Sequence, residues 1–331
     1  MIMLSTAAEH EVAPEADVHE AHRPPPVSPR KRFVAAFLSA MLPGFGQLYN
    51  GQINRAIWIF LCFGGIAIPG IASAALYLPV STTTIALGLG VLVAIAIWIF
   101  SIIDAWRVAA KLTHYRLKPW QTSGMYVVSF VICNLILLPL FVGYVRQHQI
   151  QAFKIPSDSM TPTVLRGDYL FADMRYNCPT CKIEFERGDV AIFVYPNNRN
   201  RLYIKRIIGL PGDEVRIEKG HVFVNGSPLS NTEELEKDST SRIETYGERS
   251  WRVSRAPESE SEPHTLRIPQ GQVLVLGDNR ANTKDSRHFG TVPLSDVVGR
   301  ARQVWFSLSD EGVRWDRLGV DVQRGVFSVD D

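Results

Sequence analysis

Two serines stand one residue apart in the segment Ile-Pro-Ser-Asp-Ser-Met-Thr-Pro, residues 155–162. A Ser-x-Ser in a loop is ordinarily a turn element, because serine side chains bond nearby backbone groups. A serine hydroxyl becomes a nucleophile only when a neighbouring base takes its proton. Ser157 and Ser159 are therefore candidates for covalent catalysis only if the chain supplies such a base.

A second segment, residues 203–208, reads Tyr-Ile-Lys-Arg-Ile-Ile and places Lys205 within an apolar strand pattern. Neither segment contains histidine, so imidazole is not the obvious base. Lysine can replace it only as the neutral amine, and burial among apolar side chains is what lowers its ordinary pKa of about 10.4. The competing interpretation is a surface lysine on an edge strand, whose stem packs against its neighbours.

A third segment, residues 277–287, reads Gly-Asp-Asn-Arg-Ala-Asn-Thr-Lys-Asp-Ser-Arg. In this order, behind an apolar N-terminal region, the three segments resemble the bacterial type I signal peptidases, which are membrane-anchored Ser-Lys endopeptidases. The resemblance covers residues 150–317. It implies a serine endopeptidase that cleaves signal peptides from exported preproteins through an acyl-enzyme, without a cofactor or a metal ion.

The resemblance also implies a role for each matching residue. Ser159 falls on the nucleophile of the family and Lys205 on its general base. Ser157 matches the side chain that joins the backbone N–H of Ser159 in the oxyanion hole, where donors stabilise the developing negative charge. Thr283 takes the place of a hydroxyl residue, often serine, that orients the lysine amine.

Four charged residues of the third segment match the charges that hold the lysine strand against the nucleophile loop in the family. They are Asp278, Arg280, Asp285 and Arg287. The alternative is a solvated turn, whose surface ion pairs add at most about 1 kcal/mol. Asp158 lies between the two serines, where other members often have a small residue. Its carboxylate is tolerable if it points to solvent, and it would raise the pKa of Lys205 if it turned inward.

By the same resemblance, apolar residues on both sides of the serine and the lysine form shallow pockets for the substrate. These residues are Phe153, Ile155, Pro156, Met160, Val164, Tyr203 and Ile204. Such pockets accept only small side chains at the first and third positions before the cut, as an A-x-A site presents. Taken singly, each residue is also a candidate for core packing.

The N-terminal part of the chain predicts a membrane anchor. Residues 1–32 are polar and Pro-rich and indicate a disordered tail that ends in a basic cluster. Residues 33–145 form the membrane region, and its first part, residues 33–49, is interrupted by Pro-Gly-Phe-Gly, which favours an interfacial or re-entrant helix. Spans of roughly 20 apolar residues, enough to cross the hydrocarbon core, fit three further ranges. These are residues 56–78, 82–103 and 124–145.

Loop charges orient the three expected spans. Arg107, Lys111, Arg116 and Lys118 lie between the second and third spans, whereas the turn between the first two carries no charge. By the positive-inside rule, the N-terminus is cytoplasmic and everything after the third span lies on the outer side. We therefore expect a multi-pass protein of the bacterial inner membrane, with its catalytic domain on the periplasmic face.

Residues 146–331 predict this catalytic domain, an antiparallel β domain of short strands. Runs rich in Val, Ile and aromatic residues are separated by Gly-Asp turns. The runs are Val190–Tyr195, Leu202–Ile208, Glu214–Ile217, His221–Val224, Gln272–Leu276 and Arg302–Phe306. Residues 228–264 are rich in Thr, Ser, Glu and Pro and predict an exposed insertion or a mobile hairpin. The fold class is thus membrane-anchored and mainly β, with transmembrane helices before the β domain.

Cys178 and Cys181 form a C-x-x-C within the β domain. We favour a disulfide, because the compartment outside the membrane is oxidising. A redox-active thiol pair is the next alternative. Zinc completed by histidines comes third, since a structural zinc site takes four ligands.

The expected partners follow from charge and from the resemblance. The formal net charge of +2 and the lack of a basic stripe with interleaved aromatics argue against nucleic acid. Preprotein signal peptides and the lipid bilayer are expected partners, with the protein-export machinery as a further candidate. Two alternatives to a housekeeping signal peptidase stay open. One is a specialised or self-cleaving Ser-Lys membrane protease, and the other is a non-catalytic membrane scaffold with the same fold.

Overall fold

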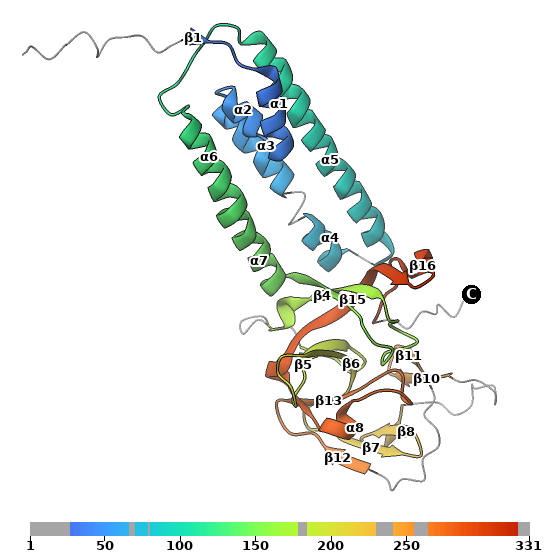
Figure 1. Cartoon of the computed structure of the whole chain (residues 1–331). Coiled ribbons are helices and arrows are strands. Elements are labelled where there is room, and N and C mark those ends of the chain that lie inside the picture. Colours follow the sequence, from blue (N-terminus) through green and yellow to red (C-terminus); the bar gives the residue numbers. More distant parts are fainter. Residues whose placement is uncertain are drawn as a thin grey trace, which may run out of the picture. The chain divides into compact units, whose positions relative to one another are not determined.

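The computed structural model describes residues 27–65, 70–78, 80–177, 184–229, 241–254 and 264–323 (Figure 1). The chain divides into two compact units, residues 1–60 with 98–130 and residues 61–97 with 131–331. The first unit contains the short N-terminal helices, and the second contains the β domain.

A sharp turn interrupts the first apolar segment. Helix α1 (Arg32–Met41) ends just before it, and helix α2 (Phe45–Tyr49) begins just after it, followed by α3 (Ile53–Gly65). Gly44 has a φ of 94°, which glycine adopts readily, and a Cβ atom at this position would lie 2.5 Å from the carbonyl oxygen of Ala56. The expected break in residues 33–49 is therefore present as a helix, a turn and a second helix.

Two longer helical stretches have the length and composition to cross a membrane, Thr82–Lys111 and Ser123–His148. The elements that form them are α5 (Val80–Lys111), α6 (Ser123–Val131), the π-helical turn Ile132–Leu137 and α7 (Leu138–His148). The π turn lies directly before Pro139, and such turns commonly accommodate a disturbed helical hydrogen-bond ladder.

The expected spans 82–103 and 124–145 fall inside these two stretches. The range 56–78 is not a single helix over the described residues, because α3 ends at Gly65 and α4 (Ile71–Tyr77) begins as a separate helix. That this segment crosses the membrane stays a prediction.

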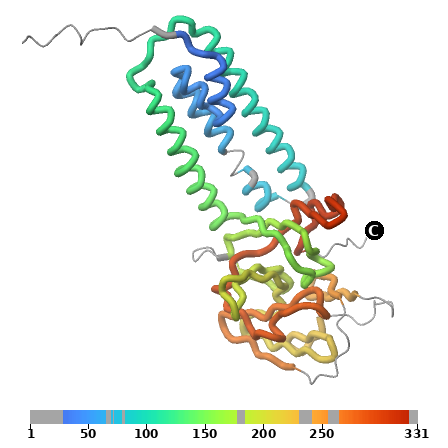
Figure 2. The backbone as a smooth tube through the Cα atoms, viewed as in Figure 1, coloured from blue at the N-terminus to red at the C-terminus, as the bar shows by residue number. Residues whose placement is uncertain are grey.

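The β domain is built on one large antiparallel sheet, in the order β14-β13-β6-β5-β15-β4-β3, with β16 paired to β15. Its strands are β3 (Ile150–Lys154), β4 (Asp168–Asp173), β5 (Val190–Val194), β6 (Leu202–Gly209), β13 (Gln272–Leu276), β14 (Val292–Pro293), β15 (Val297–Ser309) and β16 (Gly312–Val313). Figure 2 follows the chain through this sheet, where β13 returns to lie beside β6. The mainly antiparallel β domain expected from the sequence is thus confirmed.

Smaller elements complete both units. A second antiparallel sheet has the order β12-β7-β8-β9, and β10 pairs with β11. Their bounds are β7 (Glu214–Glu218), β8 (His221–Val224), β9 (Ser227–Pro228), β10 (Ser241–Tyr246), β11 (Arg249–Ser254) and β12 (His264–Arg267). In the first unit, β1 (Val27–Ser28) pairs with β2 (Tyr115–Arg116). Short helical turns are Met174–Asn177, α8 (Ser286–Phe289), Leu294–Asp296 and Trp315–Arg317.

Residues 241–254, within the range 228–264 for which an exposed insertion or a mobile hairpin is expected, form the β10–β11 hairpin. Within this hairpin, Glu244 is fully buried and Trp251 is only 1% exposed. Trp251 packs in a core cluster with Ile208 of β6 and Leu276 of β13. A segment rich in polar residues therefore contributes to the core, because its polar side chains find buried partners.

Candidate active site

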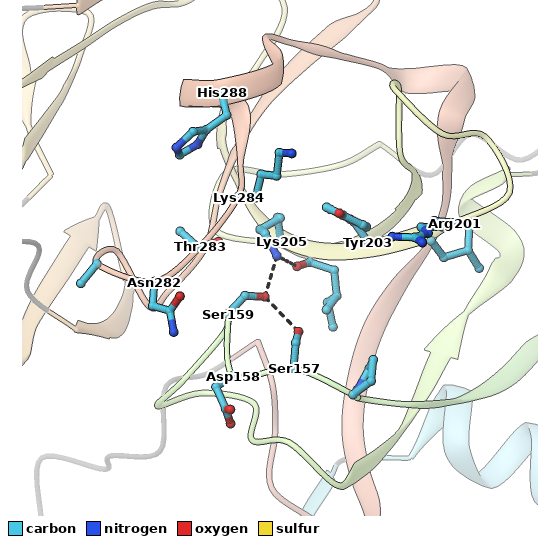
Figure 3. Close-up of a pocket in the computed structure, with 14 residues that line it drawn as sticks. Ser157, Asp158, Ser159, Arg201, Tyr203, Lys205, Asn282, Thr283, Lys284 and His288 are labelled. Atoms are coloured by element: carbon cyan, nitrogen blue, oxygen red, sulfur yellow. Dashed lines mark hydrogen bonds between the residues drawn. The ribbon is translucent and has the colours of Figure 1, made fainter.

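Ser159 and Lys205 meet in the β domain, as the sequence predicts (Figure 3). Lys205 lies on β6, in the interior of the sheet, and Ser159 lies in the turn that follows β3. The Nζ atom of Lys205 is 2.7 Å from Oγ of Ser159 and 2.7 Å from the carbonyl oxygen of Ile204. The amine is therefore held by one backbone acceptor and directed at the hydroxyl.

Burial prepares Lys205 to act as a base. The side chain is 3% exposed. Burial lowers the pKa of Lys205 from 10.5 to about 8, although the negative charges of Asp285 and Asp278 act in the opposite direction. About one amine in ten is then neutral at pH 7, compared with fewer than one in about a thousand for an ordinary lysine.

The next residue of β6 faces the other side of the strand, since side chains alternate along a strand. Arg206 is fully buried there, and its Nε and Nη2 atoms lie 2.9 and 2.6 Å from the two carboxylate oxygens of Asp278. Thr163 donates its hydroxyl to the same carboxylate at 2.6 Å. Sequence reasoning identified Asp278 but missed Arg206. The available signal was a charged side chain on the core-facing side of an apolar strand.

The loop after β13 is hydrogen-bonded directly to the turn that contains Ser159, called the nucleophile turn below. The backbone N–H of Asn279 donates to the carbonyl oxygen of Ser159 at 3.2 Å, and the side-chain amide of Asn279 donates to the carbonyl oxygen of Asp158 at 3.0 Å. A Cβ atom at Gly277 would lie 2.6 Å from the carbonyl oxygen of Ser159. This close approach of two backbones requires glycine at position 277.

Thr283 lies at the edge of the cleft, but it does not hydrogen-bond to the lysine. Its hydroxyl is buried without a partner among the described residues, and a Cβ atom at Gly277 would lie 2.2 Å from it. In this structure the acceptor that orients the amine is the carbonyl oxygen of Ile204. An orienting role for Thr283 stays a prediction.

The predicted supporting charges are all close to the site, and two form a local pair. Asp285 accepts hydrogen bonds from Arg287 at 2.9 Å and from the backbone N–H of Gly277 at 3.0 Å. Asp285 also caps α8, because its side chain accepts from the backbone N–H of Arg287. These contacts fix the loop that approaches Ser159, so the pair is more than a solvated turn.

Arg280 reaches a partner that the sequence did not indicate. Its guanidinium contacts both carboxylate oxygens of Glu244 on β10. Glu244 also accepts from Arg242 at 3.0 Å and from the indole N–H of Trp251 at 3.1 Å. Burial opposes ionisation, yet Arg280 and Arg242 hold the pKa of Glu244 below its ordinary value. The hairpin is therefore anchored to the site through a buried ionic cluster.

Ser157 and Asp158 occupy the open side of the turn. The hydroxyl oxygens of Ser157 and Ser159 are 3.4 Å apart, and Ser157 is exposed to the cleft. Figure 3 shows the carboxylate of Asp158 pointing away from the Lys205 amine. The orientation of Asp158 is thus the one that leaves the lysine unaffected.

A cleft with a volume of about 1000 Å³ contains Ser159 and Lys205. It is lined by Pro156, Ser157, Asp158, Ser159, Arg201, Leu202, Tyr203, Ile204, Lys205, Ala281, Asn282, Thr283, Lys284 and His288. Among the predicted substrate-binding residues, Pro156, Tyr203 and Ile204 therefore line the cleft. The basic residues of this lining are Arg201, Lys284 and His288. They were not predicted as site residues, because the residues next to them in the sequence do not indicate a cleft.

The other four predicted substrate-binding residues are not part of this lining and pack beneath it. Ile155, Met160 and Val164 are at most 3% exposed and pack in one cluster, and Phe153 packs against that cluster. Ile204 belongs to the same cluster and yet lines the cleft, so a substrate-binding role for these four residues stays a prediction. They support the nucleophile turn from beneath.

The last two predictions concern the C-x-x-C cysteines and metal binding. Cys178 and Cys181 lie outside the described residues. Within the described part of the chain, no three His, Cys, Asp or Glu side chains are grouped to hold a metal ion.

Comparison with known proteins identifies relatives of this arrangement. The family model described as signal peptidase, peptidase S26, matches residues 126–306. Signal peptidase I of Pseudomonas aeruginosa is 33% identical over 213 residues, which cover 55% of this chain and 75% of that protein. The probable signal peptidase I-2 of Synechocystis is 35% identical over 192 residues, which cover 55% of this chain and 71% of that protein. A crystal structure of a signal peptidase I from Enterococcus faecalis is 30% identical, covers 36% of this chain and 97% of its own, and has a TM-score of 0.25.

Proposed function

This chain belongs to the signal peptidase family, peptidase S26, and we propose that it removes signal peptides from exported preproteins with Ser159 as nucleophile and Lys205 as general base. The observation that carries the proposal is the 2.7 Å contact between a buried lysine amine and a serine hydroxyl. As a member of this family, the protein is a serine endopeptidase.

The reaction is an acyl transfer. The neutral amine of Lys205 takes the proton of Ser159 while Oγ attacks the scissile carbonyl carbon. The resulting ammonium group gives that proton to the leaving amine, and the acyl-enzyme forms. The lysine, neutral again, then takes a proton from water, which attacks the ester and releases the signal peptide.

The oxyanion needs donors at the open side of the turn. Ser157 and Ser159 both line the cleft, and in the proposed mechanism the hydroxyl of Ser157 and the backbone N–H of Ser159 are these donors. Donors placed in advance at the developing charge stabilise the transition state more than the ground state.

The substrate lies along the cleft beside β6. Pro156, Tyr203 and Ile204 give the wall an apolar character, which suits small side chains at the first and third positions before the cut. The specificity of the protein is thus for A-x-A sites.

The proposed membrane topology determines on which side of the membrane cleavage takes place. Two apolar stretches of 30 and 26 residues are long enough to cross a bilayer, and relatives of this chain are signal peptidases. With residues 56–78 as a third crossing, the N-terminus is cytoplasmic, the β domain lies on the outer face, and the preprotein reaches it from the protein-export machinery. A reporter enzyme that is active only in the cytoplasm tests this orientation when it is fused after Pro119. The fusion should be active, because the loop that contains Pro119 is cytoplasmic.

The decisive experiment is cleavage of a preprotein carrying an A-x-A site by the full-length protein in detergent. Ser159→Ala and Lys205→Ala should each abolish cleavage after the second alanine, whereas Ser227→Ala and Lys154→Ala should retain it, because these two side chains lie outside the cleft. Full activity of either dyad variant would overturn the mechanism. Binding of the preprotein without turnover by the wild-type protein would favour the scaffold.

A further inference from the structure

A buried arginine without a counter-ion lies in the first compact unit. Arg30 is only 8% exposed, and its Nε and Nη2 atoms have no hydrogen-bond partner among the described residues. A buried charge that lacks a partner is unfavourable, because the solvation it loses is not replaced. This position is therefore one at which an anion would be stabilised.

Several contacts hold Arg30 in place. Its backbone N–H donates to the carbonyl oxygen of Leu112 at 3.1 Å, next to the β1–β2 pairing. Its guanidinium carbon lies 4.4 Å from the ring centre of Tyr49 and 4.7 Å from that of Tyr115. The aromatic faces attract the cation but do not neutralise it.

Gln121 ties together the two tyrosines beside Arg30. Buried Gln121 accepts from the hydroxyl of Tyr115 at 2.9 Å and donates to the carbonyl oxygen of Tyr49 at 3.1 Å. The two tyrosines that flank Arg30 are thus fixed by one glutamine. The constellation is an organised site, and its geometry does not depend on flexible surface side chains.

Among the described residues of this unit, no carboxylate is available to Arg30. Asp104 is the only acidic residue in the ranges 27–60 and 98–130, both of which the structure describes. Its carboxylate is already engaged by Arg55 at 2.8 Å and by the amide of Gln47 at 3.0 Å. Any anion that pairs with Arg30 must therefore come from outside these described ranges.

An apolar cavity lies beside the same aromatic group. The ring of Tyr126 is 5.9 Å from that of Tyr49, and Tyr126 lines a cavity of about 250 Å³. The remaining lining residues are Leu48, Ile53, Trp120, Met125 and Ser129. Lys118 is exposed in the segment between α5 and α6, and its amine donates to the carbonyl oxygen of Gly51.

We infer that the first unit binds an acidic phospholipid, with the headgroup phosphate at Arg30 and Lys118 and an acyl chain in the cavity lined by Leu48, Ile53 and Tyr126. A cation next to an apolar cavity matches the two ends of such a lipid, and basic pockets beside membrane helices bind anionic headgroups. The site is independent of the peptidase chemistry, since it contains neither Ser159 nor Lys205.

The test uses the full-length protein in detergent, titrated with phosphatidylglycerol and, separately, with phosphatidylcholine, and bound lipid is counted by native mass spectrometry. Arg30→Gln should weaken phosphatidylglycerol binding by about fivefold or more. Lys31→Gln and Arg32→Gln remove the same charge from exposed neighbours, so each should change it by less than about twofold. Equal effects of the three variants would mean that the lipid is held only by general electrostatic attraction to basic residues, and they would overturn the proposal.

A second variant tests the cavity and keeps the proposal falsifiable if Arg30→Gln does not fold. Ser129→Trp fills the cavity from α6 without changing charge, and it should weaken phosphatidylglycerol binding while preprotein cleavage in detergent is unchanged. Glycerol phosphate, a headgroup without acyl chains, should not compete. Unchanged lipid binding by Ser129→Trp, or full competition by glycerol phosphate, would refute the acyl-chain part and with it the lipid assignment.

Discussion

Arg206 and Asp278 face each other directly behind Lys205, the proposed general base, and both side chains are completely removed from solvent. The pair lies on the opposite side of β6 from the cleft, so it contacts neither the serine nor a substrate. Its consequence is electrostatic. Asp278 alone would raise the pKa of Lys205, and Arg206 compensates that negative charge. The dyad therefore depends on a neighbour that takes no part in the reaction.

The first prediction concerns the pH dependence of cleavage. Since the neutral amine is the base, kcat/KM should rise with pH and level off above about 8. Asp285→Asn removes the largest effect that raises the pKa of Lys205, so the rise should move to lower pH. Arg206→Met leaves the charge of Asp278 uncompensated, so the rise should move to higher pH. Profiles of kcat/KM for the three proteins check this, and parallel shifts in one direction would contradict it.

The second prediction concerns stability. The pKa of Lys205 is lower in the folded chain than in the unfolded chain, so between pH 8 and 10.5 the unfolded state binds more protons and stability rises with pH. Lys205→Met removes the buried charge and should stabilise the protein at pH 6.5 by about 3 kcal/mol, at 1.36 kcal/mol for each pKa unit. The gain should shrink towards pH 10.5. Thermal melting in detergent at several pH values measures this, with Ser159→Ala as the control that keeps the lysine. A gain that does not depend on pH would show that packing, and not ionisation, is responsible.

The third prediction concerns the hairpin. Glu244→Ala leaves Arg280 and Arg242 buried without their carboxylate and should destabilise the β domain by about 3–5 kcal/mol. Glu218→Ala is the matched control. It breaks an ion pair with Arg216 in which both side chains are substantially exposed, so the cost should stay below about 1 kcal/mol. Denaturant unfolding of both variants distinguishes the two cases, and equal losses would show that the buried cluster adds nothing specific.

The fourth prediction concerns the backbone contact behind the nucleophile. Gly277→Ala places a Cβ atom against the carbonyl oxygen of Ser159 and the hydroxyl of Thr283, so the turn must move. A displacement of about 1 Å at a reacting group can cost about 100-fold in rate, and we expect kcat to fall by that order. Gly143→Ala, in α7, meets no atom within 4 Å and should leave kcat unchanged. Normal kcat in the Gly277 variant would mean that the turn yields without moving the serine.

The sequence predicted the strands and the dyad because both leave local signals. Runs of Val and Ile marked β5, β6 and β13 to within one residue at their ends. Ser159 and Lys205 were identified because each lies in a distinctive segment, although their contact joins residues 46 positions apart. Neither segment alone indicates that its residue pairs with the other. The order of the three segments along the chain, which resembles the family, indicated that Ser159 and Lys205 belong to one site.

The partners of the supporting charges could not be predicted in the same way. Arg280 and Glu244 are 36 positions apart, and the hairpin that contains Glu244 looks like an exposed polar loop in the sequence. The burial of Met160 and Val164 could not be predicted for a related reason. An apolar side chain next to a catalytic residue has the same composition whether it faces the substrate or the core, and only the path of the backbone decides.

The position of Lys205 in the interior of a sheet has a consequence for the chain during its own synthesis. In the unfolded chain the amine keeps its ordinary pKa and is almost entirely protonated at pH 7, so it cannot take a proton from serine. It becomes a base only after β5 and β13 have paired with β6 on either side of it. Proteolytic competence is thus acquired only by a correctly folded domain, and a newly made or damaged copy is harmless to its neighbours without any inhibitory segment.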